Sequence, residues 1–218
     1  MSGITSSTAL WYASRATGVV CLVLLSVVMV IGILVNQQGR LPGLPRFAVL
    51  GLHRNLSLLT VAFVVVHVLT AVADSFVSIS LAAAVIPFAS AYKPLWLGLG
   101  AVSLDLMAAV IVTSLLRRHI GRRSWRLVHW LAYASWPFAV LHSLGASTDL
   151  REGLFRDLAI ACIAAVVAAV AWRAARARTS VPRARRIPEL MVPGVQARRG
   201  VPGGRPPGQV QRVPGGDR

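Results

Sequence analysis

The stretch HRNLSLLTVAFVVVH, from His53 to His67, decides the fold, because it places two histidines at the ends of an apolar run that can cross a membrane. A second stretch of the same kind, HWLAYASWPFAVLH, runs from His129 to His142. An ionisable side chain is costly inside a bilayer, so a histidine there usually has a function. The two stretches therefore predict membrane-spanning helices that carry a functional site.

The composition around these stretches is that of an integral membrane protein. Of the 218 residues, 56% are hydrophobic and only 14% are charged, and the mean hydropathy is +0.66. A soluble domain has about 25% charged residues, and one helical span needs about 20 apolar residues. We expect an all-α, polytopic helical bundle with about five transmembrane helices. The expected spans are residues 19–35, 50–73, 95–116, 127–144 and 158–172.

The basic residues predict the orientation of the chain rather than a nucleic-acid partner. The net charge is +16, but eleven of the 23 basic residues follow Trp172 and most of the others lie in two short loops between spans. Loops rich in arginine stay in the cytoplasm. The loop arginines are Arg40 and Arg46 in one loop, and Arg117, Arg118, Arg122, Arg123 and Arg126 in the other. We expect the N-terminus outside, the C-terminus in the cytoplasm and contact with membrane lipid.

Three segments follow from this pattern. Residues 1–9 are expected to be a short extracytoplasmic N-terminus, residues 10–173 the membrane domain, and residues 174–218 a disordered cytoplasmic tail. From Arg173 onward the sequence holds seven prolines, seven glycines and eleven arginines, with too little apolar surface to fold. The Arg-, Ala- and Val-rich composition fits a high-GC bacterium, so the expected location is the cytoplasmic membrane of a bacterium.

The spacing of the histidines suggests paired metal ligands. The members of each pair are 14 and 13 residues apart, which is about 20 Å along a helix. The second and fourth spans run in the same direction, so His53 comes level with His129, and His67 with His142. Two imidazoles from opposite sides can hold a heme iron. His119 lies in the arginine loop without a counterpart and is not expected to be a ligand.

The rotation of the helices is a stricter test of this pairing. On an ideal helix a separation of 14 residues leaves His53 and His67 about 40° apart, whereas 13 residues leave His129 and His142 about 140° apart. Pro137 lies between the second two, and a proline inside a helix usually kinks it. We expect this kink to bring the two rings to one side.

The residues resemble a known family, the ferric reductase-like transmembrane domain. Besides the histidine spacing, the resemblance lies in WYASRATG from Trp11, HRNLSLL from His53 and VHWLAYASWPFAVLH ending at His142. The family includes the membrane part of NADPH oxidases and the heme subunit of the bacterial methionine sulfoxide reductase system. The chain is most similar to stand-alone actinobacterial members, over residues 10–172. The resemblance implies two b-type hemes, an inner one on His53 and His129 and an outer one on His67 and His142.

The partners follow from a departure from the family pattern. Ferric reductases and NADPH oxidases continue into FAD and NADPH domains, but this sequence shows neither a GxGxxG motif nor a second globular segment. We therefore expect a separate cytoplasmic flavoprotein, or membrane quinol, as the donor. The acceptor would be extracytoplasmic ferric iron, oxygen or a partner reductase. The chain would be the electron-transfer component of an oxidoreductase, with any flavin or quinone supplied by the partner.

Other polar residues leave alternatives open. Arg54 and Arg15 are each either a partner of a heme propionate, which a guanidinium grips with two hydrogen bonds, or a residue that marks the membrane boundary. Asp105, in the middle of the third span, should be protonated or paired. Two other functions remain possible from the sequence, a membrane anchor subunit with one heme, and a non-redox transporter or proton relay.

Overall fold

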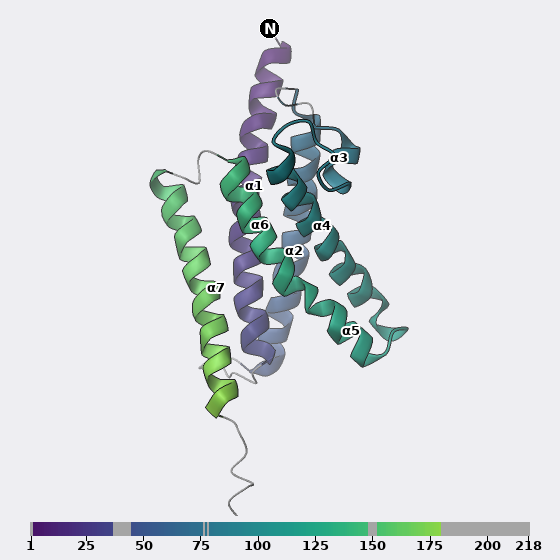
Figure 1. The fold of residues 1–218 in the computed structure, drawn as a ribbon, viewed down its shortest axis with the longest axis vertical. Coiled ribbons are helices and arrows are strands. Elements are labelled where there is room, and N and C mark those ends of the chain that lie inside the picture. The colour runs from purple at the N-terminus through teal and green to yellow at the C-terminus, as the bar shows by residue number, and fades with distance from the viewer. Residues whose placement is uncertain (1, 37–44, 76, 78, 148–151, 180–218) are drawn as a thin grey trace, which may run out of the picture. The chain divides into compact units, whose positions relative to one another are not determined.

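The computed structural model describes residues 2–36, 45–75, 77, 79–147 and 152–179, and every regular element in this part of the chain is a helix (Figure 1). The polytopic helical bundle expected from the sequence is confirmed. The helices are α1 (Ser2–Asn36), α2 (Arg46–Ala73), α3 (Leu81–Val85), α4 (Pro94–Leu115), the 3-10 helix η1 (Leu116–Arg118), α5 (Arg122–His129), α6 (Leu131–Ala146) and α7 (Gly153–Thr179).

Four helices are long and apolar enough to cross a bilayer. They cover the segments Thr8–Val35, Arg46–Ala73, Pro94–Arg118 and Gly153–Arg178. These segments contain the first, second, third and fifth of the predicted spans. Pro94 stands in the first turn of α4, where its fixed φ suits a helix start and its missing N–H costs no hydrogen bond.

The remaining predicted span, residues 127–144, is divided into two helices at Trp130. The N–H of Tyr133 donates to the Trp130 carbonyl at 3.0 Å, the three-residue spacing of a tighter turn. Pro137 has no N–H to offer the carbonyl of Tyr133, which loosens the turn before it. The bend itself lies further upstream, between α5 and α6 at the tight turn of Trp130, and α6 continues through Pro137 (Figure 1).

Helix α1 is the centre of the packing. It packs against α2, α6 and α7, while α4 packs against α6 and against α3. Helix α2 has no comparable packing against α4 or α6 within the described residues. Helix α2 carries one pair of histidines, and α5 and α6 carry the other. The space between α2 and these two helices has little close backbone packing.

Small and polar residues hold the helices of the site in place. Trp136 of α6 donates its indole N–H to the Ser26 hydroxyl of α1 at 3.0 Å, and the Ser103 hydroxyl of α4 donates to the Ser135 carbonyl of α6 at 2.9 Å. Hydrogen bonds between membrane helices contribute about 1 kcal/mol each. A buried apolar cluster surrounds the first of them: Leu22, Met29, Ile33, Trp136, Val140, Ala159 and Val166.

The ends of the chain differ in extent from the predicted segments. The backbone of α1 is already helical at Ser2, within the segment 1–9, and α7 continues to Thr179, beyond residue 173. Good helix formers such as Ala174, Ala175 and Arg176 explain this extension. The predicted tail lies outside the described residues from residue 180 onward.

Candidate functional site

His67 of α2 and His142 of α6 face each other across one cavity. Their ring centroids are 6.4 Å apart and the ring planes are inclined by 74°. The cavity has a volume of about 280 Å³ and is lined mostly by apolar residues of α1, α2, α3, α4 and α6 and of the segment between α2 and α4. The structure therefore brings His67 and His142, which the sequence predicted to lie level, together with their rings facing each other.

A backbone carbonyl of a neighbouring helix orients each ring. Nδ1 of His67 lies 2.9 Å from the Ser14 carbonyl oxygen on α1, and Nδ1 of His142 lies 2.8 Å from the Trp96 carbonyl oxygen on α4. A carbonyl oxygen can only accept, so Nδ1 carries the proton and donates it. Nε2 of each ring then keeps its lone pair, which is the tautomer that metal-binding histidines use.

Glycines make room for the same two rings. A Cβ on Gly18 would lie 3.0 Å from Cε1 of His67, and a Cβ on Gly100 would lie 2.6 Å from Nδ1 of His142. Each glycine comes four residues after the residue whose carbonyl accepts the hydrogen bond, so carbonyl and glycine share one face of the helix. We call this arrangement a glycine notch.

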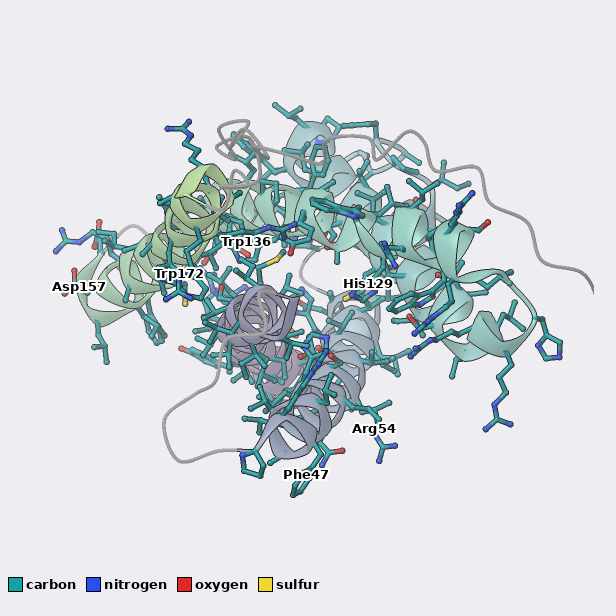
Figure 2. All side chains as sticks on the ribbon, turned by 90° about the horizontal axis from the view of Figure 1, so that it is seen from below. Phe47, Arg54, His129, Trp136, Asp157 and Trp172 are labelled. Carbon is teal, nitrogen blue, oxygen red and sulfur yellow. The ribbon has the colours of Figure 1, made fainter. Side chains whose placement is uncertain are left out.

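His53 of α2 and His129 of α5 are the other two histidines expected to pair. Gly32 of α1 makes room for His53, since a Cβ there would lie 3.2 Å from Cε1 of the ring. The two imidazoles lie within electrostatic range of each other, and Figure 2 shows His129 on the inner side of its helix. The backbone carbonyl of Val28, four residues before Gly32, lies in loose hydrogen-bonding range of His53, whereas the buried Nδ1 of His129 has no hydrogen-bond partner among the described residues.

His129 is supported by an aromatic ring instead of a glycine notch. It stacks on Trp125, with 5.0 Å between the ring centroids and 25° between the planes. The guanidinium carbon of Arg117 lies 4.6 Å from the centroid of Trp125. None of the glycines in the described part of the chain lies against His129.

Of the other four polar residues considered from the sequence, one lines the cavity and three are exposed. Arg15 lines the cavity of His67 and His142, and its guanidinium carbon lies 4.3 Å from the centroid of Trp11. Arg54 is exposed and projects outward from α2 (Figure 2). Asp105 is exposed on α4 and has no hydrogen bond or ion pair with any described residue. His119 is exposed after η1.

Two cations that the sequence did not mark as site residues connect helices around the site. Arg173 of α7 donates a hydrogen bond to the Tyr133 hydroxyl, and its guanidinium carbon lies 4.7 Å from the ring centroid of Trp130. Lys93 donates to the carbonyl of Ala146, at the end of α6, at 3.0 Å. Arg173 thus connects α7 to the bend between α5 and α6, and Lys93 connects the start of α4 to the end of α6.

These features define a multi-pass helical membrane protein with two histidine pairs inside the bundle. The sequence profile of the family described as "Ferric reductase like transmembrane component" matches residues 17–144, more than half of the 218 residues, and the chain belongs to this family. Its members generally bind heme, and membership indicates transmembrane electron transfer. No curated protein and no solved structure matches the chain.

Proposed function

We propose that the chain carries electrons across the membrane through two b-type hemes. His53 and His129 would hold the iron of one heme, and His67 and His142 the iron of the other. The observation that carries the proposal is the facing pair of rings, His67 and His142, in one apolar cavity.

The spacing of these rings suits a shared metal ion. Two imidazoles that bind one metal from opposite sides, through bonds of about 2 Å, have ring centroids roughly 6 Å apart. The observed separation is 6.4 Å. The bonds from Nδ1 to the Ser14 and Trp96 carbonyls leave both Nε2 atoms free to bind. Ring spacing and tautomer thus support the same role.

The donor set also favours heme over a bare metal ion. No group of three or more His, Cys, Asp or Glu side chains that could hold a metal ion occurs among the described residues. Two imidazoles alone leave most coordination positions of a metal to other ligands, and a porphyrin supplies four nitrogens in one plane. The mostly apolar space between α2 and the helices opposite it is a suitable environment for a porphyrin ring.

The residues of the chain have separate roles in this proposal. When bound, each heme supplies an iron that is reduced and oxidised by one electron. The four histidines would hold the two irons, and Gly18, Gly32 and Gly100 lie against three of the rings and limit their movement. Two histidines for each iron would favour outer-sphere electron transfer over oxygen binding. Arg15, at the cavity of His67 and His142, is placed to bind a propionate.

The direction of transfer follows from the arginine-rich end of the bundle, which carries η1 and α5. We propose that this end is cytoplasmic, in agreement with the positive-inside rule. The donor would be a separate flavoprotein or membrane quinol on the side of His53 and His129. The acceptor would be ferric iron, oxygen or a partner reductase on the side of His67 and His142, outside the cytoplasmic membrane of a bacterium.

The test is to purify the protein in detergent and to measure heme per chain and the reduced-minus-oxidised absorbance spectrum. We expect two hemes in the wild type. His67→Ala and His142→Ala should each lose the same heme, and His53→Ala and His129→Ala should each lose the other. His119→Ala is the matched control, because His119 is exposed and belongs to neither pair, and it should keep both.

Two results would change the proposal. If the wild type, after reconstitution with heme, remains colourless, then electron transfer through heme is wrong and a transporter or proton relay takes its place. If only the heme of His67 and His142 is found, then the chain is a one-heme membrane subunit. That second outcome is favoured by one observation, the lack of a hydrogen-bond partner for Nδ1 of His129 among the described residues.

A further inference from the structure

The end of the bundle that carries His129 has a strongly basic surface. Five exposed arginines lie there, and no Asp or Glu occurs between residues 106 and 148. None of these arginines forms an ion pair within the described part of the chain. We call them the arginine surface: Arg117, Arg118, Arg122, Arg123 and Arg126.

A continuous stack leads from this surface to the interior. The exposed guanidinium of Arg117 lies over the half-buried ring of Trp125, and Trp125 stacks on His129, with 4.6 Å and 5.0 Å between the respective centres. Trp125 also donates its indole N–H to the Ser114 hydroxyl at 3.4 Å, which orients the ring. An exposed side chain is thus connected through an aromatic ring to a histidine inside the bundle.

The other three histidines of the pairs are enclosed differently. Each of them lies over a glycine of α1 or α4, so a helix backbone closes off the side of the ring. Among the four, His129 is the one that reaches an exposed side chain through ring contacts in the described residues. This difference distinguishes His129 from the other three histidines.

We propose that the arginine surface docks a small acidic protein that carries one electron, and that Trp125 shortens the path from this carrier to the iron at His129. The proposal rests on the proposed function, since it requires iron at His129. One electron leaves the reduced carrier, whose cofactor is oxidised by one electron, and ferric iron is reduced to ferrous iron. No bond is formed or broken, and Trp125 is neither oxidised nor reduced overall.

Charge and geometry together favour an acidic protein over a lipid headgroup. Complementary charge raises the rate of protein encounter by 10-fold to 1,000-fold at low ionic strength. Arginines that serve only anionic lipid would need no ring contact with the half-buried His129. Electron input would use the stack through Trp125, whereas headgroup binding by the arginines does not require it.

The first test measures encounter with a soluble carrier. The heme-loaded protein is placed in nanodiscs of zwitterionic lipid, and its reduction by reduced plant-type [2Fe-2S] ferredoxin, an acidic carrier, is followed by stopped flow. We expect Arg122→Glu with Arg123→Glu to lower the second-order rate constant at least ~10-fold at low salt. The difference should largely disappear at about 0.5 M salt, where exposed charges are screened.

The matched control is Arg46→Glu with Arg178→Glu. It makes the same change in charge at two exposed residues outside the arginine surface, and its rate constant should stay within about threefold of the wild type. Equal slowing in both double variants would show a general charge effect and would overturn specific docking.

The second test concerns Trp125. At saturating ferredoxin, Trp125→Leu should slow the first-order reduction at least ~10-fold, and Trp125→Phe, which keeps an aromatic ring, should slow it less. Heme per chain and the absorbance spectrum should match the wild type in the phenylalanine variant. Equal first-order rates in all three proteins would overturn the role of Trp125.

Dithionite separates this proposal from the function on which it rests. If no heme is bound, the proposed function fails. If heme is bound and dithionite reduces every variant equally, but ferredoxin also reduces the Arg122→Glu, Arg123→Glu protein as fast as the wild type, then only the docking proposal fails. Effects of the variants that occur only in discs with anionic lipid would assign the arginines to headgroups and also overturn it.

Discussion

Gly100 of α4 leaves the space that the ring of His142 occupies, because a Cβ there would lie 2.6 Å from Nδ1 of that ring. The ring is also tied to the Trp96 carbonyl, so it cannot move away without losing a hydrogen bond. Gly100→Ala should therefore cost about 1–3 kcal/mol through overpacking. We expect less heme per chain and a lower midpoint temperature for the thermal loss of heme absorbance.

The other glycines provide a graded series with its own control. The corresponding contacts of Gly18 and Gly32 are longer, 3.0 Å and 3.2 Å, whereas Gly51 on α2 has nothing within 4 Å. Heme loss should decrease from Gly100→Ala through Gly18→Ala to Gly32→Ala. Gly51→Ala should be neutral or stabilising by up to about 1 kcal/mol. If Gly51→Ala lowers heme content as much as Gly100→Ala, then Gly18, Gly32 and Gly100 do not act by making room for the histidine rings.

The histidines could be predicted from the sequence, but their supports could not. His67 and His142 stand out because an ionisable side chain is rare in an apolar run and because the pairs have matched spacing. Gly18 and Gly100 lie on other helices, and local sequence does not tell which ring a glycine faces. Trp125 did carry a local signal, since it precedes His129 by four residues and thus shares its helix face.

At the scale of the elements, the long helices were predictable and the bend was only partly so. Apolar runs of sufficient length specify α1, α2, α4 and α7. Pro137 indicated a kink, but its position at Trp130 depends on the tight turn to Tyr133 and on contacts from α7. Those contacts join residues that are 40 positions apart in the chain, so no local pattern shows them.

Arg173 should control the angle between α5 and α6. Its planar guanidinium stacks near Trp130 and Tyr133 and donates to the Tyr133 hydroxyl. Arg173→Lys keeps the charge but loses the planar group, at a cost of about 0.5–2 kcal/mol for the cation–π contacts. His129 lies directly before the bend, so the EPR signal of the heme proposed for His53 and His129 should broaden.

The same variant should leave the heme proposed for His67 and His142 unchanged. Neither of those residues contacts the bend, and their rings are held by α1 and α4. Arg178→Lys is the control, because Arg178 is exposed near the end of the same helix. Broadening of both heme signals in Arg173→Lys would mean that α7 supports the whole bundle rather than the bend.

At the scale of the whole molecule, the straight helix α2 separates the two pairs. His53 and His67 are 14 residues apart on it, which is about 21 Å along the axis. If His129 binds together with His53, as proposed, the two pairs lie at opposite ends of the space between α2 and the helices α5 and α6. Electron transfer between the two proposed hemes then covers most of the thickness of the hydrocarbon core, about 30 Å.

The orientation of the helical bundle in the membrane can be tested with topology reporters. The start of α1 and the end of α7 lie at opposite ends of the bundle (Figure 1), as an odd number of crossings requires. The arginine surface should face the cytoplasm. Alkaline phosphatase, which is active only outside the cytoplasm, should therefore be active when fused after Ser90 and inactive when fused after Gly121. Green fluorescent protein fused after Thr179 should fluoresce. The opposite pattern would place His67 and His142 at the cytoplasmic face and would reverse the proposed direction of electron transfer.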